Sequence, residues 1–76
     1  MPTTTAQLKY IDVSFRFKQT RKEAKMTQPQ FAEKLGISLS SVKGLETGDF
    51  CPNIGIIRKW SKLFKKPYDW IFDGKY

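Results

Sequence analysis

The segment QPQFAEKLGISLSSVKGLET, from Gln28 to Thr47, constrains the fold more than any other part of the chain. Its apolar residues recur at the spacing of two short amphipathic helices, at Phe31, Leu35, Ile37, Val42 and Leu45. Gly36 stands between these helices, where it can take a positive φ at little steric cost and end the first one. Ser38 can then accept a backbone N–H bond and start the second. Because Ala32 is small enough for close crossing, the segment predicts two short helices at a steep angle, joined by a tight turn.

Three further helices are predicted from the same kind of spacing. The first is expected to start at an Asp12 cap, after an N-terminal extension of residues 1–11 that is partly disordered. Asn53 caps the fourth helix, and a short fifth covers about Tyr68 to Phe72. The expected core consists of Val13, Phe17, Phe31, Leu35, Ile37, Val42, Leu45, Ile54, Ile57, Trp60, Phe64 and Ile71. We therefore predict one all-α domain of five short helices over residues 12–76.

Length and composition exclude several other classes of protein. A chain of 76 residues forms one domain near the lower size limit for independent folding. It has no histidine, the commonest general base and metal ligand, and its seven carboxylates show no paired spacing. Cys51 is the only cysteine, so it has no partner for an internal disulfide or a metal cluster. No apolar run approaches the length of a membrane span. We therefore expect a protein without catalytic activity, metal, cofactor or membrane association, located in a reducing cytoplasm.

The formal charge of +7, from 14 basic and 7 acidic residues, has two interpretations. A solvated basic surface keeps a small protein soluble, and a polyanionic partner would call for the same excess of positive charge. Charge alone does not choose between them.

The stretch MTQPQFAEKLGISLSSVKGLETGDFCPN, residues 26–53, resembles the Cro/CI-type helix-turn-helix family of phage repressor-like and XRE-type regulators. The positions that match the family pattern in register are Thr27, Gln28, Phe31, Ala32, Leu35, Gly36, Ser38, Val42, Glu46, Gly48 and Pro52. DWIFDG, residues 69–74, resembles the closing helix of the family. The resemblance implies a five-helix lambda-repressor-like domain that binds double-stranded DNA with its third helix in the major groove. Together with the charge, it favours nucleic acid as the partner.

Base contacts are expected from Ser38 and from the outward residues of the third helix, Leu39, Ser40, Lys43 and Gly44. Lys43 can donate to guanine O6 or N7, and Leu39 can pack on a thymine methyl group. The resemblance places base contacts at Leu39, Ser40 and Gly44, although many relatives carry Gln or Arg there. The alternatives stay open. Leu39 could lie at the edge of the core, and Lys43 could contact only phosphate or solvent. Gly44 is explained either by neutral drift or by a collision that a side chain there would make with DNA.

Phosphate contacts are expected at the start of the second helix, where free N–H groups and the helix dipole favour an anion. The resemblance implies Gln28 for this role, with Thr27 beside it. The loop GDFCP has no Lys or Arg, so its contribution should come from backbone N–H groups and Asn53. Lys18, Lys25 and Lys43 are candidates to compensate. The basic run Lys59, Lys62, Lys65 and Lys66 is interpreted as a solvated face that suits the C-terminal dipole of the fourth helix.

Two further sets of residues have structural predictions. The resemblance implies an ion pair between Arg21 and Glu46 that fixes the third helix against the first, the alternative being two unrelated surface charges. Tyr68, Trp70 and Phe72 cannot all face inward beside Ile71 on so short a helix. They are expected to form a contact between two copies of the chain, and leftover surface aromatics are the alternative.

The sequence is thus interpreted as a transcriptional regulator, most simply a repressor, that binds a pseudo-palindromic operator as a homodimer that is weak in solution. No small-molecule ligand is expected. The resemblance implies a prokaryotic or phage-encoded protein that is cytoplasmic and associates with the nucleoid when bound. Two other classes stay open: an antitoxin or controller protein that acts with a protein partner, and a protein-interaction module on the same fold.

Overall fold

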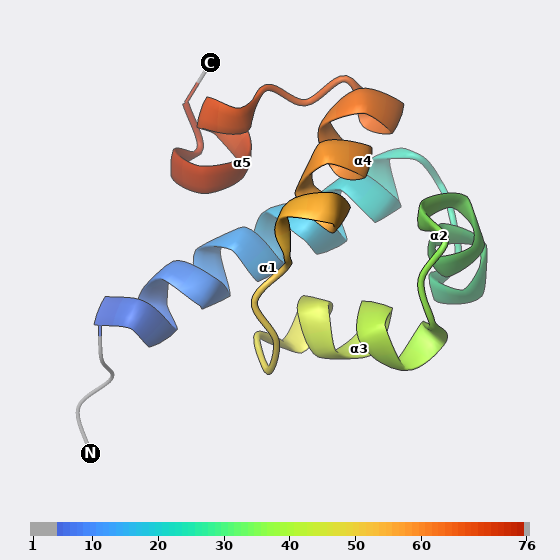
Figure 1. Ribbon diagram of the computed structural model, residues 1–76, viewed down its shortest axis with the longest axis horizontal. Coiled ribbons are helices and arrows are strands. Elements are labelled where there is room, and N and C mark those ends of the chain that lie inside the picture. Colours follow the sequence, from blue (N-terminus) through green and yellow to red (C-terminus); the bar gives the residue numbers. More distant parts are fainter. Residues whose placement is uncertain (1–4, 76) are drawn as a thin grey trace.

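Five helices make up the computed structural model, which describes residues 5–75 (Figure 1). They are α1 (Thr5–Glu23), α2 (Gln28–Leu35), α3 (Leu39–Thr47), α4 (Ile54–Phe64) and α5 (Tyr68–Asp73). The long α1 runs through the middle of the domain, with α3 on one side and α5 on the other, and α2 and α3 cross rather than run alongside each other. The predicted all-α, five-helix architecture is confirmed.

The start of α1 differs from the prediction. The helix begins at Thr5, so Asp12 is an exposed residue inside it and the predicted Asp12 cap is wrong. The residues before Asp12 have no apolar period that could have indicated a helix, and Figure 1 shows this end of α1 projecting beyond the other helices. Residues 1–4 lie outside the described part, and the disorder expected there stays a prediction.

The ends of α2 and α3 are fixed by the residues that the sequence indicated. The Oγ1 atom of Thr27 accepts from the backbone N–H of Gln30 at 3.3 Å, and Gln30 Oε1 accepts from the N–H of Thr27 at 2.9 Å. Gly36 takes a φ of 70° and ends α2. Ser38 Oγ then accepts from Ser41 N at 3.1 Å and starts α3. These short-range bonds set the turn between the two helices, because they satisfy N–H groups that neither helix can satisfy internally.

Aromatic side chains fill the core between α1 and α4. The ring of Phe17 lies 4.9 Å from that of Phe31 and 5.2 Å from that of Trp60, both edge to face, and Trp60 in turn meets Trp70 at 6.2 Å. Edge-to-face pairs add to the area that each ring buries. Ile54 was predicted to be in the core but is 70% exposed at the start of α4, so that prediction is wrong.

Two polar contacts attach α4 and α5 to α1. The indole N–H of Trp60 donates to Thr20 Oγ1 at 2.9 Å, and that hydroxyl donates to the carbonyl of Arg16 at 2.9 Å. Arg16 itself donates to the carbonyls of Ile71 and Phe72, both at 2.9 Å. The buried indole N–H of Trp60 therefore has an acceptor. The guanidinium of Arg16 closes the C-terminal end of α5, where a cation also suits the helix dipole.

Candidate nucleic-acid interface

An ion pair connects α1 to α3, and a glutamine of α2 donates a hydrogen bond to the carboxylate of that pair. Arg21 Nε lies 2.7 Å from Glu46 Oε2, and Gln28 Nε2 donates to Glu46 Oε1 at 3.2 Å. A second nitrogen of Arg21 donates to the carbonyl of Met26, in the turn between α1 and α2, at 2.9 Å. The side chains of Arg21 and Glu46 are only 14% and 3% exposed. The structure thus places Gln28 beside the Arg21–Glu46 ion pair that the resemblance implied, and the bonds among these three residues fix the orientation of α3 against α1 and α2.

The outer side of α3 is exposed along its length. Leu39 is 37% exposed, Ser40 and Lys43 are also exposed, and Val42 and Leu45 on the opposite side are buried. The hydroxyl of Ser38 is engaged in the helix cap and lies 2.9 Å from that of Ser41. Among the predicted base-contact residues, Leu39, Ser40 and Lys43 therefore share one open surface, and Ser38 lies at its N-terminal end.

Gly44 does not belong to that open surface. It is buried, and a Cβ atom built on it would overlap the ring of Phe50. The prediction that Gly44 faces a base edge is therefore wrong, and neither drift nor a collision with DNA is needed to explain the glycine. The cause lies six residues further along the chain: Phe50, in the loop after α3, lies on the helix where a side chain would otherwise stand.

The loop after α3 uses its own backbone donors internally. The N–H groups of Asp49 and Phe50 donate to the carbonyl of Gly44 at 3.0 and 3.2 Å. Thr47 Oγ1 donates to Asp49 Oδ2 at 3.0 Å, and Asn53 Oδ1 caps α4 by accepting from Ile56 N at 2.9 Å. The expectation that backbone N–H groups of this loop bind phosphate is therefore wrong for Asp49 and Phe50, whereas the amide nitrogen of Asn53 stays a candidate.

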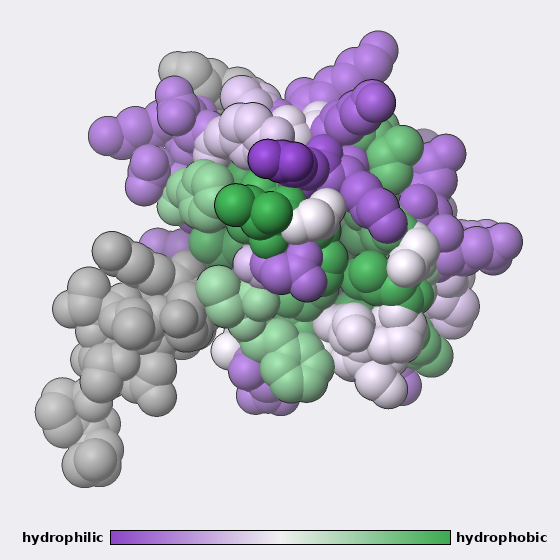
Figure 2. Space-filling view, viewed as in Figure 1, coloured by the Kyte–Doolittle hydropathy of each residue, from purple (hydrophilic) through white to green (hydrophobic). Residues whose placement is uncertain are grey.

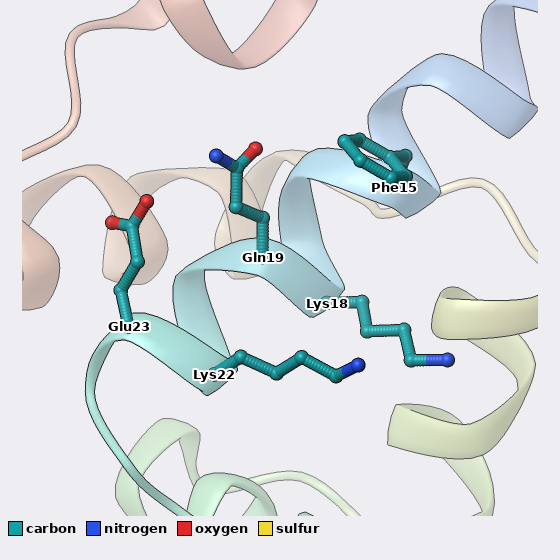
Figure 3. Close-up of a pocket in the computed structure, with 5 residues that line it drawn as sticks. All are labelled: Phe15, Lys18, Gln19, Lys22 and Glu23. Carbon is teal, nitrogen blue, oxygen red and sulfur yellow. The ribbon is translucent and has the colours of Figure 1, made fainter.

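Lysines stand near the start of α2. Lys25, with a φ of 57°, lies in the turn two residues before Thr27, and its side chain is exposed. Lys18 and Lys22 extend from α1 toward the side of α3, whereas Gln19 and Glu23 point the other way (Figure 3). These five-atom side chains can swing toward a polyanion lying across α3. The sequence reasoning did not select Lys22, although its spacing of four residues from Lys18 places both on one helix face.

The hollow in Figure 3 is a shallow depression of about 490 Å³ on the outer face of α1. Phe15 forms one of its walls and is 68% exposed. Its lining combines one aromatic ring with Lys18, Gln19, Lys22 and Glu23, without the converging polar groups that fix a small ligand.

Two lysines of the basic run in and after α4 bind other parts of the protein. Lys59 Nζ donates to the carbonyl of Leu35 at 3.1 Å, which closes the C-terminal end of α2. Lys66 Nζ lies 3.0 Å from Glu23 Oε1 and 4.6 Å from the ring centre of Trp70. The interpretation as a purely solvated face is wrong for these two lysines, whereas Lys62 and Lys65 are exposed.

The predicted dimer contact divides into one buried and two exposed residues. Trp70 is 7% exposed and packs on Trp60, so its assignment to a surface is wrong. Tyr68 and Phe72 are 49% and 50% exposed. With the exposed Ile54 they line a depression of about 270 Å³ between α4 and α5. We call Ile54, Tyr68 and Phe72 the α4–α5 surface.

Two short helices joined at Gly36, with the second held to α1 by Arg21 and open on its outer side, define a helix-turn-helix domain. A family model described as helix-turn-helix matches residues 17–71. The chain therefore belongs to this family of Cro/CI-type, XRE-like DNA-binding domains. Searches of curated proteins and of solved structures gave no match. Among residues 5–75, no helix has both the length and the apolar character that crossing a membrane requires.

Proposed function

We propose that this protein is a transcriptional repressor that binds a pseudo-palindromic operator as a dimer, with α3 in the major groove. The observation that carries the proposal is the Arg21–Glu46–Gln28 contact, because it fixes α3 while its outer side stays open. A rigid helix of this width fits the major groove of B-form DNA. Leu39, Ser40 and Lys43 are then the side chains nearest to base edges.

Charge supports the same partner. The net charge of +7 favours association with a polyanion. Gln28 keeps one amide N–H beyond the one it gives to Glu46, so it can donate to phosphate while Glu46 holds it in place. Thr27, Lys18, Lys25 and Asn53 are the other proposed phosphate contacts. Phosphate contacts position a protein on DNA but carry no sequence information.

Two copies are needed to read a site of useful length, because one short helix contacts few base pairs. A two-fold axis would place two copies of α3 about 34 Å apart, one turn of DNA. We assign the contact between copies to the α4–α5 surface, which is apolar and exposed. So few residues make a small interface, and small interfaces are weak. The protein should therefore be a monomer or weak dimer in solution and a dimer on its operator, in the cytoplasm of a prokaryotic host.

The test is selection of binding sites from random duplex DNA, followed by affinity measurements at increasing salt. If the dimer neutralises about 6–10 phosphates, affinity should fall roughly 10³–10⁵-fold between 50 and 200 mM salt. Lys18→Ala and Lys25→Ala should each reduce the salt slope by about one. Lys62→Ala makes the same charge change near the C-terminal end of α2 and serves as the control. A flat salt response of the wild type with every DNA would contradict the proposal.

A further inference from the structure

The ring of Phe50 is held against the backbone of α3. Its carbon atoms occupy the space that a Cβ atom on Gly44 would need, and its own N–H donates to the carbonyl of Gly44 at 3.2 Å. Gly48 makes the turn that brings it there, with a φ of 87° and an N–H bond to the same carbonyl. The hydroxyl of Thr47 lies 3.1 Å from this carbonyl and 3.0 Å from Asp49 Oδ2, and its one proton can be donated to either acceptor. The bonds around Gly44 therefore fix the backbone that carries the ring.

This ring is not a core residue. Phe50 is 51% exposed, so half of its surface faces solvent although its backbone is fixed. Burial would have stabilised the domain, because apolar area removed from water contributes favourably to folding. The ring is instead held in a set position with one side open.

The open ring lies at the edge of the surface proposed to enter the groove. Gly44 follows Ser40 by four residues, so the two are neighbours along one side of α3. Ser40 is small and exposed, whereas Gly44 is covered by the ring of Phe50. Figure 2 shows apolar side chains gathered over the loop that joins α3 and α4, beside the pale, weakly polar surface of α3. The half-exposed ring over Gly44 therefore lies at the edge of the open surface to which Ser40 and Lys43 belong.

The chemistry of the ring selects what it can contact. Phosphate is excluded as its ligand, because the ring has no donor and Asp49 beside it is negatively charged. In the major groove, the C5-methyl group of thymine is the apolar feature of the base edges, and Phe is among the side chains that contact it. We propose that the ring of Phe50 reads a thymine in each half-site through this methyl group, an inference that rests on the proposed function. Gly44 is then the residue that makes room for the reading group.

The experiment replaces thymine by uracil, one position at a time, in the selected operator. This removes only the methyl group. At one position in each half-site the wild type should lose about fourfold in affinity, the effect of withdrawing roughly one methyl group from apolar contact. Phe50→Ala should bind the thymine and uracil forms of that position equally. Leu39→Ala is the matched control, because it removes a second candidate apolar contact and should leave the sensitivity at the Phe50 position intact.

Gly44→Ala tests the same contact while keeping the ring. The new methyl group must displace the ring from α3, so discrimination between thymine and uracil should fall at the same position. Ala has the higher helix propensity, whereas displacing the ring from α3 costs packing, so circular dichroism must show that the variant is folded before its binding is compared. The double variant Gly44→Ala/Phe50→Ala should bind no more weakly than Phe50→Ala alone. A weaker double variant would mean that the alanine itself collides with DNA.

Each outcome has a distinct meaning. Salt-dependent, sequence-selective binding with unchanged uracil sensitivity in Phe50→Ala overturns this inference and leaves the proposed function standing. If the folded wild type binds no DNA at all, both this inference and the proposed function are overturned. Circular dichroism of each variant establishes folding, and Gly44→Ala supplies the answer should Phe50→Ala fail to fold.

Discussion

The two halves of the domain share one apolar core but differ in the contacts that supplement it. Around α2 and α3, buried residues such as Phe31 and Val42 are supplemented by the Arg21–Glu46 pair, by Gln28 and by capping bonds at both helix starts. Around α4 and α5, aromatic burial dominates, and α5 has no side-chain cap at its start. Burial is non-directional, whereas hydrogen bonds depend on angle and distance. The comparison suggests that α4 and α5 supply stability and that the polar contacts orient the reading helix.

The largest expected effect is on the aromatic half. Trp60 is fully buried, so Trp60→Ala should lower the free energy of unfolding by about 3–5 kcal/mol, a large part of the stability of a small domain. Urea denaturation followed by circular dichroism measures it. Phe15→Ala, at an exposed ring, should change stability by less than about 0.5 kcal/mol. A loss below about 1 kcal/mol for Trp60→Ala would contradict the role given to burial.

The next effect concerns the polar half. Glu46→Ala should cost about 1.5–3 kcal/mol, the range for hydrogen bonds to charged groups, and a double-mutant cycle with Arg21→Ala should give a coupling energy above roughly 0.5 kcal/mol. The pair Lys66–Glu23 is the control: the side chain of Glu23 is 51% exposed, and exposed pairs contribute about 0–1 kcal/mol. Coupling near zero at Arg21–Glu46 would mean that these charges do not fix α3.

In the half formed by α2 and α3, substitutions of Lys43 and Gln28 should have different effects, the first on sequence specificity and the second on overall affinity. Lys43→Ala should cost about 1–3 kcal/mol at one base pair of the selected site and little on random DNA. Gln28→Ala should weaken binding to all sequences alike, because phosphates are the same in each. Competition binding against single-base variants measures both. Equal losses on specific and random DNA for Lys43→Ala would make it a phosphate contact.

The smallest effect on stability is expected at the α4–α5 surface. Phe72→Ala should lower the free energy of unfolding by about 1 kcal/mol, since only half of the ring is buried. It should nevertheless reduce cooperative binding of a second copy to the operator, as measured by titration in gel-shift experiments. Trp70→Ala should instead destabilise the fold, because that ring is buried. Unchanged cooperativity in Phe72→Ala and in Tyr68→Ala would place the dimer contact elsewhere.

Features that depend on residues close in sequence could be predicted. The caps at Thr27, Ser38 and Asn53 bond to N–H groups three residues away, and Gly36 ends its helix through its own backbone. The start of α1 could not be predicted, because its first turns have no apolar period. A sequence pattern indicates a helix mainly where that helix has a buried apolar face.

Features that depend on distant residues needed the structure. The six residues of α5 span less than two turns, so periodicity could not show which of its aromatic side chains face inward. Trp70 faces inward because its ring packs on Trp60 of α4. Gly44 is a different case, because Phe50 is close in sequence: helical spacing gave no indication that the turn at Gly48 would bring the Phe50 ring back over Gly44. The predicted base and phosphate contacts remain proposals, since they concern a partner rather than the chain itself.

The hydrogen bonds of Arg16 to the carbonyls of Ile71 and Phe72 join residues 55 and 56 positions apart. Synthesis at about 5–20 residues per second separates these groups in time by several seconds. A nascent chain that has left the ribosome only as far as Thr47 holds Arg21, Gln28 and Glu46. It lacks Trp60, whose ring packs on Phe17, and it lacks the core residue Ile71. The reading helices are thus translated before the residues that stabilise them, and folding to completion must wait until α5 has emerged.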